Sequence, residues 1–126
     1  MFNADSIPVI LIAEDNDIDA LLMEAILKEF YLVEFAINGS DALTMLKTKH
    51  YDLLITDITM PVMGGIELLV VTEALYPELP VVVVSSISWQ YHAYRDKYPN
   101  AKMWIEKPYK PSVLLGLVTG IIANSN

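Results

Sequence analysis

The strongest constraint on the fold is a run of four valines, Val81 to Val84, that contains no polar residue. A strand with one face in water alternates apolar and polar side chains. A run without that alternation is typical of a strand buried on both faces. Such strands belong to parallel sheets that carry helices on both sides. We therefore expect two layers of helices around a central parallel sheet.

The rest of the chain alternates between short apolar runs and segments whose apolar residues have helical spacing. The runs predict strands at residues 8–13, 32–37, 53–57, 81–84 and 102–105, and the other segments predict helices at 17–30, 40–49, 66–76, 88–98 and 111–123. In the first helix, capped by Asn16 or Asp17, one face is expected to be buried: Ile18, Leu21, Leu22, Ala25, Ile26 and Phe30. Five strands alternating with five helices predict a single domain, residues 1–126, with a doubly wound α/β fold. In that fold, ligands bind beyond the carboxyl ends of the strands.

Composition excludes several classes of protein. The chain has 126 residues, of which 54% are hydrophobic and 19% charged, which argues against disorder. A net charge of −8 argues against direct binding to nucleic acid, because phosphate recognition needs a basic surface. The longest late apolar run, residues 113–123, is about half the roughly 20 residues that cross a bilayer, and no targeting segment is evident. The chain lacks cysteine. We expect a cytoplasmic protein without a membrane span.

Reactive side chains follow four of the predicted strands. Glu14 and Asp15 follow the first, Asp57 ends the third, Ser85 follows the fourth, and Lys107 follows the last. The carboxyl ends of parallel strands share one edge of the sheet, so these groups should converge there. An isolated aspartate after a strand is more often a turn or cap residue than a nucleophile. The convergence favours a functional site, and three carboxylates crowded together without metal should raise the pKa of at least one of them.

The motifs at these strand ends resemble, in order and spacing, the receiver domain of two-component response regulators. They are Ala13-Glu14-Asp15-Asn16, Thr56-Asp57-Ile58-Thr59-Met60-Pro61 with Gly65, Pro80 with the valine run and Ser85-Ser86, and Glu106-Lys107-Pro108-Tyr109. The resemblance covers essentially the whole chain. It implies a flavodoxin-like fold with strand order 2-1-3-4-5. It also implies partnership with a sensor histidine kinase or a phosphotransfer protein.

The resemblance implies a Mg²⁺-dependent reaction in which Asp57 is the phosphoacceptor. Asp15 would bind the metal directly, and Glu14 would bind it directly or through water. Asp57 itself and the backbone carbonyl of Thr59 would complete the protein ligands. A carboxylate is a poor nucleophile towards an anionic phosphoryl group, so the metal would both offset charge and align the attack.

The resemblance also implies a switch. Ser85 would bond a phosphoryl oxygen, Lys107 would pair with the phosphoryl group, and the Lys107–Pro108 peptide bond would be cis. Trp104 occupies the position of a Tyr or Phe that rotates on activation in the family. The switch would alter the face formed by the fourth helix, the fifth strand and the fifth helix, where a partner or a second copy of the chain would bind.

Three other functions share some of these features. A haloacid-dehalogenase-type phosphatase has a second Asp two residues after the first, where this chain has Thr59. A flavodoxin-type cofactor binder needs a Ser/Thr/Gly-rich loop after the first strand, whereas Glu14 and Asp15 would repel phosphate. A degenerate receiver would act as a binding module without phosphorylation. The complete acidic set with Ser85 and Lys107 argues against that reading.

Overall fold

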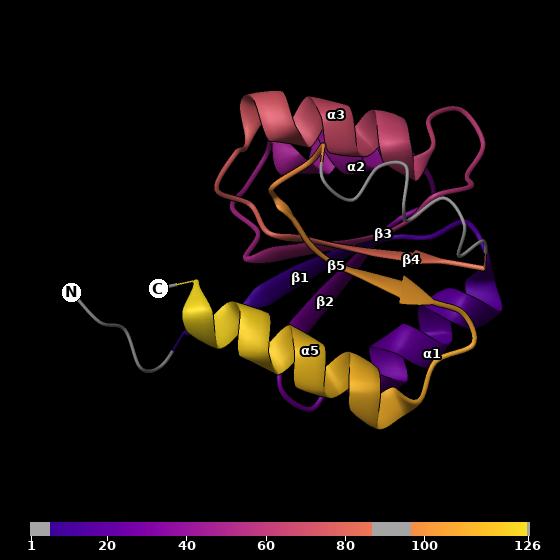
Figure 1. Cartoon of the computed structure of the whole chain (residues 1–126), viewed down its shortest axis with the longest axis vertical. Coiled ribbons are helices and arrows are strands. Elements are labelled where there is room, and N and C mark those ends of the chain that lie inside the picture. Colours follow the sequence, from indigo (N-terminus) through magenta and orange to yellow (C-terminus); the bar gives the residue numbers. More distant parts are fainter. Residues whose placement is uncertain (1–5, 87–96, 126) are drawn as a thin grey trace.

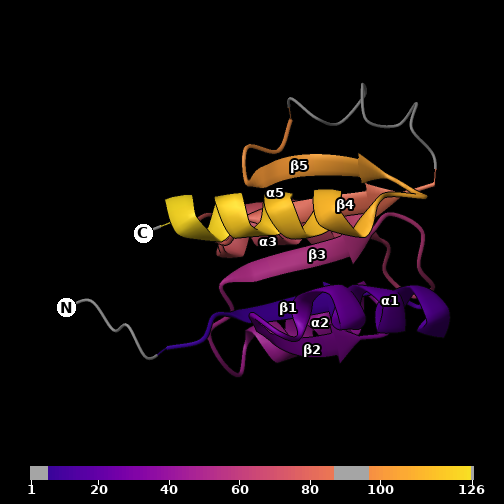
Figure 2. The same ribbon diagram turned by 90° about the horizontal axis from the view of Figure 1, so that it is seen from below.

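The chain forms a five-stranded parallel sheet. The computed structural model describes residues 6–86 and 97–125. The strands are β1 (Val9–Ala13), β2 (Leu32–Ala36), β3 (Leu53–Asp57), β4 (Val81–Ser85) and β5 (Ala101–Glu106). They lie in the order β2-β1-β3-β4-β5, which Figure 2 shows side by side. The predicted parallel sheet and its strand order are confirmed.

Helices cover both faces of the sheet (Figure 1). Helices α1 (Asp17–Leu27) and α5 (Pro111–Asn124) lie on one face, and α2 (Gly39–Leu46) and α3 (Gly65–Leu75) lie on the other. The described residues thus contain four helices. The fifth predicted helix, at 88–98, falls almost entirely outside them. None of the described helices combines the length and apolarity required to span a bilayer. The doubly wound α/β, flavodoxin-like architecture is confirmed.

The valine run of β4 lies at the centre of the core. Val81 and Val83 pack on the side of α2 and α3, and Val82 and Val84 pack on the side of α1 and α5. All four are at most 1% exposed. Successive side chains of a strand point to opposite faces, so a strand covered on both sides contributes apolar residues at every position. The expectation of burial on both faces is confirmed.

The predicted buried face of α1 is wrong. Met23 and Leu27 are buried, whereas Ile18 is 74% exposed, Leu21 61% and Leu22 53%. Of the other residues predicted for that face, Ala25 and Phe30 are also exposed, and Ile26 is partly buried against the core. Apolar residues occupy most of the circumference of α1, so more than one face has helical spacing. The Asn16 side chain caps the helix as predicted, by accepting a hydrogen bond from the Asp19 amide at 3.0 Å, while Met23 and Leu27 are the residues that pack into the core.

Candidate functional site

The carboxyl ends of four strands meet at one edge of the sheet. Asp57 pairs with Val84 across β3 and β4, and Ser85 pairs with Glu106 across β4 and β5. Glu14 directly follows β1, which lies on the other side of β3. Lys107 directly follows β5. Parallel pairing therefore places residues that are 93 positions apart in sequence, Glu14 and Lys107, in contact.

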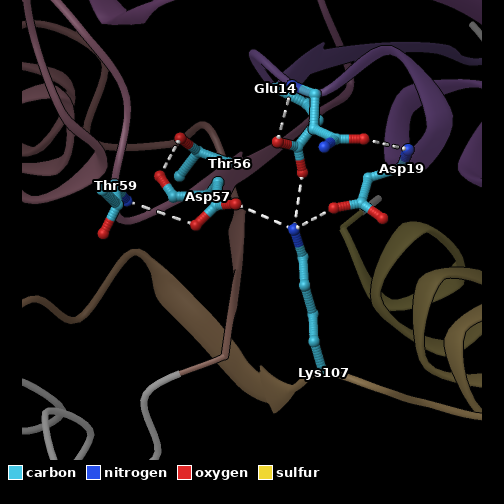
Figure 3. Close-up of polar contacts among 7 residues, drawn as sticks. Glu14, Asp19, Thr56, Asp57, Thr59 and Lys107 are labelled. Carbon is cyan, nitrogen blue, oxygen red and sulfur yellow. Dashed lines mark hydrogen bonds and ion pairs between the residues drawn. The ribbon is translucent and has the colours of Figure 1, made fainter.

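The ammonium group of Lys107 joins three carboxylates. Its Nζ donates to Glu14 Oε1, Asp19 Oδ2 and Asp57 Oδ2, each at 2.8 Å (Figure 3). The side chains of Lys107 and Asp57 are 16% and 13% exposed, and that of Glu14 is 1% exposed. Three of the groups expected at the strand ends, Glu14, Asp57 and Lys107, are thus in direct contact in a largely buried environment.

Burial and charge alter the protonation of this cluster. Burial raises the pKa of Glu14 above its ordinary value, and the neighbouring charge of Asp57 raises it further, while Lys107 opposes both effects. Burial alone would lower the pKa of Lys107. Its hydrogen bonds to Asp19, Asp57 and Glu14 outweigh that effect and raise the pKa above the ordinary range. Lys107 is therefore a permanent positive charge at neutral pH.

Three carboxylates form a group that fits a divalent cation. One oxygen from each of Glu14, Asp15 and Asp57 lies within 4.8 Å of the other two. Ligand oxygens on opposite sides of an octahedral Mg²⁺ are about 4.2 Å apart, twice the usual bond length. Hard anionic oxygens are also the ligands that Mg²⁺ prefers. Small side-chain movements would therefore allow the three acids to coordinate one ion.

Local backbone contacts fix the orientation of Asp57. The Thr59 amide donates to Asp57 Oδ1 at 3.2 Å, and the Thr56 hydroxyl donates to the Asp57 carbonyl at 2.9 Å. The Gly65 amide, at the start of α3, donates to the Ile58 carbonyl at 2.8 Å. A Cβ atom on Gly65 would lie 1.9 Å from the Asp57 carbonyl oxygen, so α3 packs against the end of β3 as only glycine allows.

The remaining predicted residues lie around this cluster. Ser85 is 1% exposed at the end of β4, and its carbonyl accepts a hydrogen bond from the Lys107 amide at 2.8 Å. Trp104 pairs with Val83 and packs, partly buried, against the core under α2 and α3. Strand alternation places Ser85 on the same face of the sheet as Val83 and Trp104. The Lys107–Pro108 peptide bond is cis.

One residue of the cluster, Asp19, was not predicted from the sequence. It lies in the first turn of α1, where Asp17 is a second acid. Helical spacing shows that the two acids point in different directions, but the rotation of α1 decides which of them faces the sheet edge. That rotation was predicted wrongly. The spacing of Asp19, four residues after Asp15, was the available signal.

Comparisons with known proteins agree with this geometry. The family model described as response regulator receiver domain matches residues 10–119. The chain is 34% identical over 80 residues to the response regulator receiver protein CpdR of Brucella abortus. The aligned region covers 64% of this chain and 67% of that protein. It is 44% identical over 78 residues to a protein-glutamate methylesterase/protein-glutamine glutaminase of Clostridium acetobutylicum. That match is 60% of this chain but only 23% of the longer protein.

Solved structures share the fold. The crystal structure of a CheY-like receiver domain protein from Methanospirillum hungatei JF-1 superposes with a TM-score of 0.87 at 26% identity. The superposition covers 95% of this chain and 97% of that one. The family match extends over most of the chain and includes every strand end that contributes to the acidic cluster. The chain therefore belongs to the receiver domain family of two-component response regulators.

Proposed function

We propose that this receiver domain accepts a phosphoryl group on Asp57 from a phosphohistidine of a sensor histidine kinase or a phosphotransfer protein, in a Mg²⁺-dependent reaction. One observation carries the proposal. The Asp57 carboxylate accepts a hydrogen bond from the Lys107 ammonium at 2.8 Å and also belongs, with Glu14 and Asp15, to a group of acids whose oxygens can hold a divalent cation. Lys107 supplies one positive charge at the nucleophile, and a bound Mg²⁺ would supply a second, as transfer of an anionic group requires.

Each group has a defined task in this reaction. Glu14, Asp15 and Asp57 would hold the metal, with the Thr59 carbonyl as a further ligand. When bound, Mg²⁺ would offset the negative charge of the phosphoryl oxygens. An oxygen of Asp57 forms a bond to phosphorus as the bond from phosphorus to the donor histidine nitrogen breaks. The histidine leaves as neutral imidazole because its other ring nitrogen carries a proton.

Lys107 and Ser85 act on the product. Lys107 remains charged, so its ammonium can pair with the dianionic phosphoryl group. The Ser85 hydroxyl bonds a phosphoryl oxygen and moves towards it. This movement leaves space on the same face of the sheet, into which Trp104 rotates. The phosphoryl group adds about −1.5 to −2 of charge, and the energy of binding it stabilises the switched state.

Two surfaces would serve the partners. The face of β5 and α5, with the predicted helix at 88–98, would carry the output contact or a homodimer. Val113 on α5 is 45% exposed. The phosphodonor would dock on the exposed apolar side chains of α1, Ile18, Leu21 and Leu22, because α1 begins only two residues after the metal ligand Asp15.

Binding of beryllofluoride, a phosphoryl mimic, tests the proposal. With Mg²⁺ present, the wild-type protein should bind beryllofluoride at one site, measured by ¹⁹F NMR. Binding should be lost in Asp57→Asn and in the presence of EDTA. Failure of the folded wild-type protein to bind would contradict phosphorylation and favour the degenerate receiver, which binds partners without phosphorylation.

A further inference from the structure

Asp19 is an acidic partner of Lys107 that the phosphoacceptor chemistry does not require. Its Oδ2 accepts a hydrogen bond from Lys107 Nζ at 2.8 Å, and its side chain is 37% exposed. Within the described part of the chain, the acids close enough to share a metal are Glu14, Asp15 and Asp57. Asp19 therefore contacts the lysine from outside that trio.

The contacts of Lys107 leave no hydrogen-bond donor unused. An ammonium group has three N–H bonds. In this structure all three have carboxylate acceptors: Glu14, Asp19 and Asp57, each at 2.8 Å. Before Lys107 can donate to a phosphoryl oxygen, at least one of these hydrogen bonds must weaken or break.

We propose that Asp19 is a positioning residue that holds the Lys107 ammonium on the α1 side of the site and competes with the phosphoryl group on Asp57 for it. The competition rests on the proposed phosphoacceptor function. The positioning of Lys107 by Asp19 in the unphosphorylated protein rests on the observed contact alone.

The arrangement of the side chains means that the Asp19 carboxylate and a phosphoryl group on Asp57 would compete for the Lys107 ammonium. Figure 3 shows Asp19 and Asp57 on opposite sides of the Lys107 ammonium. A movement of the ammonium towards a phosphoryl group on Asp57 is therefore a movement away from Asp19. In addition, the Asp19 carboxylate places a negative charge next to the region where phosphoryl charge would accumulate. Both effects favour the unphosphorylated protein.

Three variants separate the contact from a general charge effect. Asp19→Asn removes the charge that pairs with Lys107. Asp17→Asn is the matched control, because Asp17 is an exposed acid in the same first turn of α1. Both changes alter the net charge and the charge at the helix N-terminus equally. Asp19→Glu keeps the charge and has one more methylene with which to reach Lys107.

The first measurement is the Kd for beryllofluoride at saturating Mg²⁺, so that any change in metal affinity does not contribute. We expect Asp19→Asn to bind about fivefold more tightly than wild type, the effect of losing one partly exposed ion pair. Asp17→Asn and Asp19→Glu should lie close to wild type. Equal affinity of Asp19→Asn and wild type, or an equal gain in Asp17→Asn, would overturn the competition.

The second measurement needs no ligand. The order parameter of the Lys107 ε-methylene, from ¹³C relaxation in metal-free protein, should fall in Asp19→Asn and stay unchanged in Asp17→Asn. An unchanged value in Asp19→Asn would overturn the hold on Lys107. Suppose that wild type binds no beryllofluoride but the order parameter falls in Asp19→Asn. The phosphoacceptor function and the competition would then be wrong, whereas the positioning of Lys107 by Asp19 would be supported.

Discussion

Replacement of Gly65 by alanine tests whether the start of α3 positions Asp57. A Cβ atom at this position would lie 1.9 Å from the Asp57 carbonyl oxygen and 2.9 Å from Ile58 Cα. Cβ atoms essentially never approach other atoms closer than 3.0 Å, so the two backbone segments must separate by about 1.1 Å. This separation also breaks the 2.8 Å hydrogen bond from the Gly65 amide to the Ile58 carbonyl.

The expected cost follows from these two effects. Overpacking of a well-packed contact costs about 1–3 kcal/mol, and a lost backbone hydrogen bond costs about 1 kcal/mol. The intrinsic advantage of alanine over glycine in a helix returns about 0.5–1 kcal/mol. We therefore expect Gly65→Ala to lower the free energy of unfolding by about 2 kcal/mol. At a typical slope of about 2 kcal/mol per molar urea, the unfolding midpoint should fall by about 1 M.

Gly120→Ala is the matched control. Gly120 is inside α5, and a Cβ atom there would meet nothing within 4 Å. The free energy of unfolding of this variant should rise by about 0.5–1 kcal/mol, because alanine has the higher helix propensity.

The rate of phosphorylation by acetyl phosphate should fall about 100-fold in Gly65→Ala, since a shift of about 1 Å misplaces the nucleophile. Equal urea midpoints for Gly65→Ala and wild type would show that the contact between α3 and the end of β3 does not require glycine.

Three further predictions concern charge. Lys107→Met should destabilise the metal-free protein by about 3 kcal/mol at pH 7.5, because it leaves Glu14 buried without a cation. Burial already raises the pKa of Glu14, so Glu14 should take up a proton as the pH falls towards 4.5, the ordinary pKa of a glutamate, and the destabilisation by Lys107→Met should then shrink. A destabilisation that urea unfolding shows to be independent of pH would contradict this prediction. Hydrogen bonds from Lys49 and Tyr51 hold the pKa of Glu34 below its ordinary value. Tyr51→Phe should therefore lower the free energy of unfolding by about 0.5–1 kcal/mol at pH 7, and this difference from wild type should disappear as the pH falls through the Glu34 pKa. An equal difference in acid would contradict a role for the charged Glu34 carboxylate. Mg²⁺ at 100 times its Kd should stabilise the wild-type protein by about 2.7 kcal/mol in thermal unfolding, and no stabilisation would exclude a site specific to the folded state.

The sheet and the centre of the site could be predicted from the sequence because both depend on strand ends. A valine run without alternation requires burial on both faces, and parallel strands then bring Glu14, Asp57 and Lys107 to one edge whatever the details of the helices. The register confirms this convergence. The contacts among the three side chains follow from it.

The rotation of α1 could not be predicted in the same way. Apolar residues surround much of this helix, so a periodic pattern does not distinguish the face of Met23 and Leu27 from that of Ile18 and Leu22. Only the packing of Met23 and Leu27 into the core beneath the sheet distinguishes the two faces. With the wrong face of α1 predicted to be buried, it was not predicted that Asp19 faces the sheet edge and contacts Lys107. The phosphoryl-transfer, metal-binding and switch roles of the site residues, and the helix at 88–98, stay predictions.

The intact mass of the protein after incubation with acetyl phosphate and Mg²⁺ tests directly whether Asp57 accepts a phosphoryl group. We predict a gain of one phosphoryl group in wild type, and no gain in Asp57→Asn or in wild type with EDTA. A gain that persists in folded Asp57→Asn would place the phosphoryl group elsewhere. No gain in wild type would contradict the assignment of Asp57 as a metal-dependent phosphoacceptor.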